Sequence, residues 1–179
     1  GRIRCRAALV LSSGLPLALC NDLQQIARRY GVNLLGPNSL GFQRPPLKLN
    51  VSTLGPLAAP GPLALVSQSG AITAALVEWS AAHGIGFSGI VSLGDRIDVD
   101  FGDLLDYFAL DRNTRAILLY IESINHPRKF MSAARAAARV KPVVVVKSGR
   151  LAQGAKAAAT HTGALAGADA VYDAAFRRA

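Results

Sequence analysis

Cysteines, aromatic residues and long apolar runs are scarce in this sequence, and each shortage excludes a class of protein. Only two cysteines, Cys5 and Cys20, occur in 179 residues. They are too few for a disulfide scaffold and lack the spacing of a metal site, so we expect both to be buried apolar side chains. No stretch approaches the roughly 18 apolar residues that span a bilayer, and no signal peptide pattern opens the chain. These absences predict a soluble cytoplasmic protein with no membrane partner.

A nucleic-acid-binding surface is also disfavoured, although the chain is basic. The formal net charge is +9, but aromatic residues make up only 6% of the chain, and the basic residues are scattered singly or in pairs. Nucleic-acid sites instead combine clustered basic residues with stacking aromatics. Small anions such as phosphate and nucleotides suit a basic surface of this kind. With 51% hydrophobic and 17% charged residues, the composition predicts a globular α/β protein.

Apolar runs of strand length alternate with amphipathic helical stretches, which is typical of a parallel sheet covered by helices. Strands are predicted at residues 7–11, 33–35, 63–66, 86–92, 116–121 and 142–147. Helices are predicted at residues 19–30, 71–83, 101–109, 128–139 and 169–178. From about residue 61 onward we therefore expect a parallel sheet of about five strands with helices on both faces.

Prolines and polar residues replace this alternation between Gly41 and Pro62. Because prolines cannot continue a helix or a central strand, we interpret this stretch as an interdomain connection. The segment before it contains only a strand, a helix and a short strand, too little to bury a sheet independently. We expect it to be the end of a domain whose beginning is absent, packed as an incomplete appendage.

The turn at Ser67 to Gly70 directly follows a buried-strand pattern and precedes an alanine-rich helix. Free backbone N–H groups and the positive end of a helix dipole would then meet at the carboxyl edge of the sheet, where they can hold a phosphate. The same four residues also fit a helix N-cap with a tight turn. No Walker-type lysine loop is present.

A second loop carries His161 among small residues, from Thr160 to Gly167. A neutral imidazole is nucleophilic near pH 7, and a glycine-rich loop can move, so this histidine suits a phosphoryl carrier. Glu122 ends the apolar strand at 116–121, which predicts that it lies at the same sheet edge and orients the imidazole. Glu122 also fits a solvated strand-end acid. We expect Ser69, Glu122 and the His161 loop to converge on one cleft.

The remaining histidines and acidic residues favour structural interpretations. His83 and His126 fall at a helix end and a helix start. Asp95, Asp98, Asp100, Asp103 and Asp106 do not have the spacing of a calcium loop, and Asp100 with Asp103 fits the cap and first turn of a helix. We therefore predict no metal site in the chain. Asn38 lies in a Gly-Pro turn, where it can bind either the local backbone or a ligand.

Five segments, in this order, resemble the succinyl-CoA synthetase superfamily, and are most similar to the ADP-forming acetyl-CoA synthetases: residues 36–41, 64–71, 120–122, 141–150 and 160–167. The resemblance implies that residues 1–53 are the C-terminal part of a Rossmann-like CoA-binding domain, that 54–62 connect, and that 63–179 form a flavodoxin-like domain. It implies a phosphohistidine at His161 with Glu122 as its carboxylate partner. It also implies phosphate binding by Ser67, Ser69, Gly70 and Gly163, and an acyl or CoA site at Asn38. Some relatives have Cys in place of Ser39, to which we assign no chemistry.

The resemblance further implies an NDP-forming acyl-CoA synthetase, which interconverts acyl-CoA, phosphate and NDP with carboxylate, CoA and NTP. Coenzyme A or acyl-CoA, ATP or ADP, and magnesium are the expected cofactors, with the nucleotide held mainly by an ATP-grasp domain or subunit that this sequence lacks. Such enzymes are commonly oligomers. Residues 93–150 also resemble the synthetase-like half of bacterial protein lysine acetyltransferases fused to a GNAT domain. The alternative function is therefore an acyl-CoA-sensing regulatory module.

Overall fold

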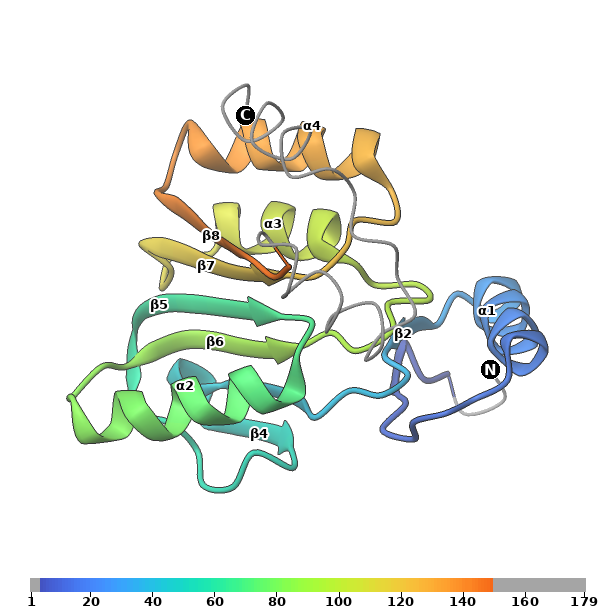
Figure 1. The fold of residues 1–179 in the computed structure, drawn as a ribbon, viewed down its shortest axis with the longest axis horizontal. Helices are drawn as coiled ribbons and strands as arrows, with labels where there is room; N and C mark the ends of the chain where they lie inside the picture. Colours follow the sequence, from blue (N-terminus) through green and yellow to red (C-terminus); the bar gives the residue numbers. More distant parts are fainter. Residues whose placement is uncertain (1–3, 150–179) are drawn as a thin grey trace.

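The computed structural model describes residues 4–149, which form two sheets of different size (Figure 1). The predictions for His161, for Gly163 and for a helix at 169–178 concern residues outside this range. The smaller sheet pairs β1 (Ala7–Leu9) with β2 (Asn33–Leu35) in parallel, and α1 (Leu17–Tyr30) connects them. Helix α1 stops at Gly31, which adopts a left-handed conformation with φ of 63°, as helix C-caps commonly do.

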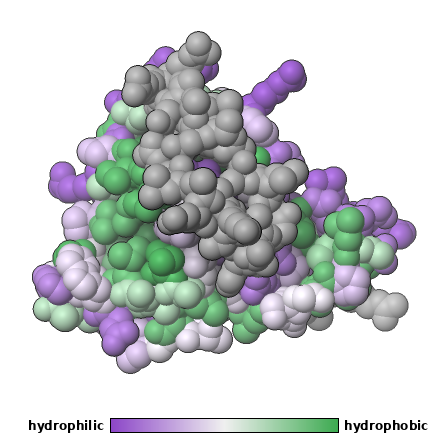
Figure 2. Space-filling view, in the orientation of Figure 1, coloured by the Kyte–Doolittle hydropathy of each residue, from purple (hydrophilic) through white to green (hydrophobic). Residues whose placement is uncertain are grey.

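The small unit leaves much of its apolar surface open. Leu17 is 77% exposed and Ile26 56% exposed, and Figure 2 shows hydrophobic residues on the surface at the α1 end of the molecule. Cys20 is buried, as predicted, but Cys5 is exposed, so the prediction for Cys5 is wrong. Its thiol lies 2.7 Å from the carbonyl oxygen of Ala7. The cause is that few residues pack around β1, whose burial pattern is mostly exposed.

The larger sheet has six strands in the order β4-β3-β6-β5-β7-β8. Four of them are parallel: β5 (Pro60–Ser67), β6 (Phe87–Ser92), β7 (Ala116–Ile121) and β8 (Val143–Lys147). These are the four strands that the apolar runs predicted after residue 61. The carboxyl ends of the parallel strands share one edge of the sheet.

The other two strands, β3 (Gly41–Arg44) and β4 (Leu49–Ser52), correct the interpretation of residues 41–52 as an irregular connection. β3 runs antiparallel to β6 and also pairs with β4. The prolines do not interrupt either strand, because Pro45 and Pro46 lie in the short 3-10 turn η1 (Pro45–Leu47) that joins them. Residues 41–52 thus complete the large sheet and are no appendage.

Polar side chains occupy the buried positions of β3. Gln43 is fully buried, and its amide nitrogen donates to Ser52 Oγ at 3.2 Å and to the Pro56 carbonyl at 3.1 Å. Its amide oxygen accepts from the Ala58 backbone at 2.9 Å. The side chain therefore satisfies its own hydrogen bonds, which removes most of the cost of burying it.

Helices cover both faces of the large sheet, as predicted (Figure 1). α3 (Phe101–Leu110) and α4 (Pro127–Ala138) lie on one face, and α2 (Gly70–Ala82) lies on the other. Phe101 and Phe108 of α3 and Phe130 of α4 are almost fully buried in the core, each contributing roughly 1.5–3 kcal/mol by burial. None of the helices in residues 4–149 is long and apolar enough to cross a membrane.

The loop after β6 joins the two sheets. The Asp95 amide donates to the Pro37 carbonyl at 2.8 Å, and the Val99 amide donates to the Leu34 carbonyl at 3.0 Å. In the opposite direction, the Leu34 amide donates to Asp98 Oδ2 at 2.8 Å. These bonds bring the turn that contains Asn38 to the carboxyl edge of the large sheet.

Candidate functional site

The turn between β5 and α2 is held by its own side chains. Ser67 is fully buried, and its hydroxyl donates to the Ser69 carbonyl at 2.9 Å and accepts from the Ser69 amide at 3.1 Å. Ser69 is the N-cap of α2, with its Oγ accepting from the Ile72 amide at 3.3 Å. The N-cap interpretation is thus correct for Ser69, while Ser67 lies beneath the turn and shapes it.

Capping leaves two donors at the start of α2. The amides of Gly70 and Ala71 make no hydrogen bond to any of residues 4–149, and both residues line a cavity. They stand at the positive end of a 13-residue helix, which favours an anion. Helix capping and anion binding are therefore compatible at this turn, because the Ser69 side chain binds the Ile72 amide while the amides of Gly70 and Ala71 stay available.

Gln68 ties this turn to Glu122. Its side-chain oxygen accepts from the backbone amides of Glu122, at 2.7 Å, and Ser123, at 3.0 Å. The backbone N–H of Gln68 in turn donates to the Tyr120 carbonyl at 3.1 Å, which extends the pairing of β5 with β7. The half-buried Glu122 therefore has a fixed backbone beside the start of α2.

The Asn38 turn forms a further wall. Asn38 adopts a left-handed conformation with φ of 58°, which asparagine tolerates better than most residues. Its amide nitrogen lies 3.3 Å from Asp95 Oδ1. The adjacent Ser39 is buried, and its hydroxyl donates to the Ser92 carbonyl at 2.5 Å and accepts from the Gly41 amide at 2.9 Å. Ser39 thus has a structural role that accounts for its burial.

A cavity of about 740 Å³ brings these walls together. Asn38, Ser69, Gly70 and Glu122 all line it, so Ser69 and Glu122 meet in one cleft as predicted. The described lining residues are Gly14, Asn38, Leu40, Gln68, Ser69, Gly70, Ala71, Ala74, Gly94, Asp95, Arg96, Glu122, Ser123 and Asn125. The roles given to these residues, and the place of His161 and Gly163 in the cleft, stay predictions.

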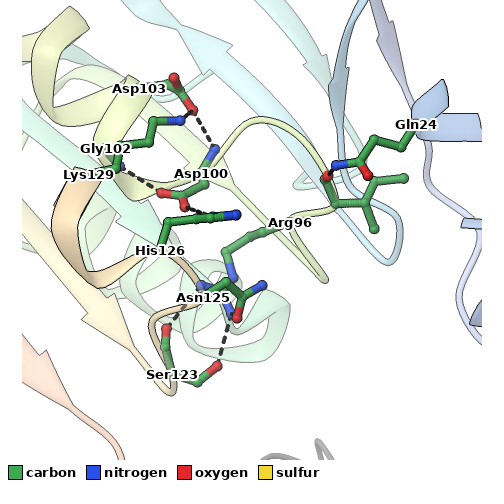
Figure 3. A network of polar contacts seen from close by, with 10 residues as sticks. Gln24, Arg96, Asp100, Gly102, Asp103, Ser123, Asn125, His126 and Lys129 are labelled. Carbon is green, nitrogen blue, oxygen red and sulfur yellow. Dashed lines mark hydrogen bonds and ion pairs between the residues drawn. The ribbon is translucent and has the colours of Figure 1, made fainter. Parts of the chain in front are cut away.

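Four polar residues that line the cavity were not predicted from the sequence: Gln68, Arg96, Ser123 and Asn125. Arg96 is only 4% exposed and binds Ser123 and Asn125 through its guanidinium (Figure 3). The sequence signal that could have indicated Arg96 is its position directly after Gly94 and Asp95, close to the end of β6. Nothing local in the sequence marks its partners, because they lie 27 and 29 residues further along the chain.

The acidic cluster forms a helix cap, as predicted. Asp100 caps α3 by accepting from the Gly102 amide at 2.8 Å, and Asp103 completes a capping box. Asp100 also lies 3.0 Å from His126 Nδ1, and Asp103 pairs with Lys129 at 2.5 Å (Figure 3). Within residues 4–149, no three His, Cys, Asp or Glu side chains gather as they would around a metal ion.

The two described histidines also have the expected positions at helix ends. His126 is the N-cap residue of α4, and His83 is the C-cap residue of α2. The His83 ring stacks on Trp79 with 4.1 Å between centroids, and its Nδ1 lies 2.8 Å from the Trp79 carbonyl oxygen. Neither histidine lines the cavity.

The mixed sheet with helices on both faces defines an α/β domain, whose carboxyl edge presents a helix start, a carboxylate and a buried guanidinium. Residues 60–179 match the family model described as the succinyl-CoA ligase like flavodoxin domain, and the chain belongs to this family. The flavodoxin-like fold and the resemblance to ADP-forming acetyl-CoA synthetases are both confirmed.

Named relatives support this assignment. The chain is 51% identical over 158 residues to subunit alpha of the ADP-forming acetate–CoA ligase I of Pyrococcus furiosus, covering 88% of this chain and 34% of that protein. It is 44% identical to the ADP-forming acetate–CoA ligase I of Archaeoglobus fulgidus, covering 99% of this chain and 27% of that protein. The chain thus spans about a third or less of these relatives.

Solved structures agree with the comparison of sequences. The dinucleotide forming acetyl-coenzyme A synthetase 1 of Ca. Korarchaeum cryptofilum, in complex with phosphate and ADP, superposes with a TM-score of 0.93. It is 39% identical, and the match covers 99% of this chain and 39% of that one. The near-complete coverage shows that both sheets of this chain have counterparts in one solved fold.

Proposed function

We propose that this chain is the part of an ADP-forming acyl-CoA synthetase in which phosphate meets the acyl group and His161 takes up the phosphoryl group. The observation that carries the proposal is the pair of amides at Gly70 and Ala71, which make no hydrogen bond within residues 4–149 and belong to residues that line the same cavity as Glu122 and Asn38. Two N–H groups at a helix start bind phosphate oxygens without a lysine loop. The relatives named as acetate–CoA ligases support the same reaction class.

In the first step, a phosphate oxygen attacks the carbonyl carbon of the acyl-CoA thioester. The carbon–sulfur bond breaks and CoA leaves as the thiolate, which gives an acyl phosphate. The Gly70 and Ala71 amides hold the phosphate through both states, and their fixed positions favour attack by orienting the nucleophile. We assign Asn38 to the acyl or CoA side of the cavity, where its amide can bind a carbonyl oxygen.

In the second step, an imidazole nitrogen of His161 attacks the phosphorus atom, and the phosphorus–oxygen bond to the acyl group breaks. The acyl group leaves as the carboxylate, and the phosphoryl group stays on the ring. Glu122 accepts a hydrogen bond from the other ring N–H, which fixes the tautomer and stabilises the positive charge that develops on the imidazole. An oxygen of the β-phosphate of ADP then attacks the phosphohistidine to give ATP and free His161.

The other parts of the reaction need residues beyond the described cavity. We assign residues 1–53 to the end of a CoA-binding domain, with the difference that β3 and β4 belong structurally to the large sheet. The nucleotide, with its magnesium, we assign to an ATP-grasp domain or partner subunit, since one relative is named as a subunit alpha. The acetate–CoA ligase names favour this function over the alternative of a GNAT-linked regulatory module.

The experiment is phosphoryl labelling of the full-length protein from two directions. Radioactive phosphate with acetyl-CoA labels it from the acyl side, and ATP with magnesium labels it from the nucleotide side. We expect an acid-labile, base-stable label on His161, because the phosphoramidate bond hydrolyses in acid. His161→Asn should abolish the label from both donors, and Glu122→Gln should slow it by about 10- to 100-fold.

His83→Asn and His126→Asn are the matched controls, because both histidines lie at helix ends outside the cavity. Both variants should label like the wild type. Undiminished labelling of His161→Asn contradicts the mechanism. A wild type that takes no label from either donor, yet binds acyl-CoA, points to the regulatory alternative.

A further inference from the structure

The loop after β6 contacts both sides of the cavity. On one side, Asp95 accepts a hydrogen bond from Asn38 at 3.3 Å, and its backbone amide binds the Pro37 carbonyl at 2.8 Å. On the other side, the next residue, Arg96, reaches the segment that follows Glu122 (Figure 3). Two adjacent residues thus connect the Asn38 turn to the Glu122 segment.

Arg96 is held in an unfavourable state that needs compensation. Its backbone has φ of 56°, in the left-handed region, which is unfavourable for a residue other than glycine. Its side chain is also buried, at 4% exposure, and burying a cation is costly without partners. Strain and buried charge at one residue beside a cavity are the pattern of a functional position.

The contacts of the guanidinium are specific to arginine. Nη1 donates to the Ser123 carbonyl at 3.0 Å, while Nη2 donates to Ser123 Oγ at 2.9 Å and to Asn125 Oδ1 at 3.2 Å. The group also lies over the Phe101 ring, 5.5 Å from its centroid. The planar, forked guanidinium can make these bonds and the stacking contact together, whereas a lysine ammonium is neither planar nor forked.

Gln68 completes a clamp on the same segment. Its side-chain oxygen accepts from the backbone N–H groups of Glu122 and Ser123, and Arg96 donates to the carbonyl of Ser123. Both side chains also donate to Ser123 Oγ, so Gln68 and Arg96 hold the same short stretch of chain. Gln68 belongs to the turn that presents Gly70, so the clamp links the carboxylate to the phosphate-holding helix start as well.

We propose that Arg96 is a positioning residue for Glu122. It fixes the segment from Glu122 to Asn125 relative to the Asn38 turn, so that the carboxylate keeps the orientation that its proposed role requires. Arg96 acts through Glu122 and leaves phosphate binding to the amides of Gly70 and Ala71. This inference rests on the proposed function of His161 and names a residue to which that function had given no role.

The test is a double-mutant cycle on the rate of His161 labelling from acetyl-CoA and phosphate, with the full-length protein. Arg96→Gln should lower the maximal rate by about 10- to 100-fold, with the KM for phosphate changed by less than about threefold. In a Glu122→Gln background the same substitution should cost less than about threefold, because coupled residues are not additive. Arg96→Lys should recover only part of the rate, since the fork is lost.

Lys129→Gln is the control for removing a nearby cation, because Lys129 pairs with Asp103 on the surface and does not line the cavity. It should label at the wild-type rate. Thermal melts of every variant separate a folding defect from a rate defect, and Arg96→Lys serves if Arg96→Gln does not fold. Wild-type rates in a folded Arg96 variant, or fully multiplicative effects with Glu122→Gln, overturn the proposal. An unlabelled wild type instead overturns the proposed function itself.

Discussion

Replacing Gly94 with alanine should separate the Asn38 turn from the large sheet. Gly94 has φ of 63°, and a Cβ there would lie 2.0 Å from the Pro37 carbonyl oxygen and 2.6 Å from that of Asn38. The left-handed backbone costs an alanine about 1–2 kcal/mol. The clash is with main-chain atoms, which cannot rotate away, so overpacking adds about 1–3 kcal/mol. We therefore expect a total loss of about 2–5 kcal/mol in the free energy of unfolding.

Gly84→Ala is the matched control. Gly84 has φ of 65°, but a Cβ there would meet nothing within 4 Å. It should lose only the backbone cost of about 1–2 kcal/mol. Urea unfolding of both variants, analysed with equal m-values, measures the difference of about 1–3 kcal/mol as the cost of the clash. Equal losses in the two variants would refute the close packing of loop and turn.

Two further predictions concern capping and pH. Ser69→Ala should cost about 1 kcal/mol by urea unfolding because α2 loses its cap, whereas Ser69→Asp should keep the stability but weaken phosphate binding by charge repulsion. Burial raises the pKa of Asp111, but the hydrogen bond from Thr114 and the charge of Arg44 outweigh it, so the net pKa is lowered. The stabilisation by ionised Asp111 is present above the unfolded pKa near 3.8 and is lost as the pH falls through the lowered folded pKa. Asp111→Asn should therefore reduce the loss of unfolding free energy at acid pH, measured by urea unfolding across that range. An unchanged loss at acid pH in this variant counts against the assignment.

The sequence predicts strands well where apolar residues alone decide the structure. The runs at 116–121 and 143–147 lie within a residue of their predicted ends, because short continuous runs rich in β-branched and other apolar residues favour strands. β3 was missed because its buried positions hold Gln43 and Arg44. Arg44 is paired with Asp111 at 3.1 Å, a partner 67 residues away that no local pattern reveals.

The candidate site likewise contains some residues that the sequence predicts and others that it does not. Ser69 and Glu122 were placed in one cleft because both follow parallel strands, and that rule of topology needs no knowledge of side-chain contacts. Arg96 and Gln68 follow strands too, but their significance lies in hydrogen bonds to partners 27 to 55 residues away. Such contacts depend on the register of the finished sheet, which the sequence does not display.

The pairing of β3 with β6 decides which part of the molecule carries the Asn38 turn. Gly41 is in register with Ser92, and just before it the Leu40 amide donates to Ser92 Oγ at 3.1 Å while Ser39 donates to the Ser92 carbonyl. The Asn38 turn is therefore anchored to the end of β6 on one side and to the loop at Asp95 on the other. Both anchors follow β6, so the hydrogen bonds at the end of that strand help to set the distance from Asn38 to the start of α2. The Asn38 amide also donates to the Ser12 carbonyl at 2.9 Å, so the loop between β1 and α1, whose Gly14 lines the cavity, is the part of the wall that a displacement of β1 and α1 would move.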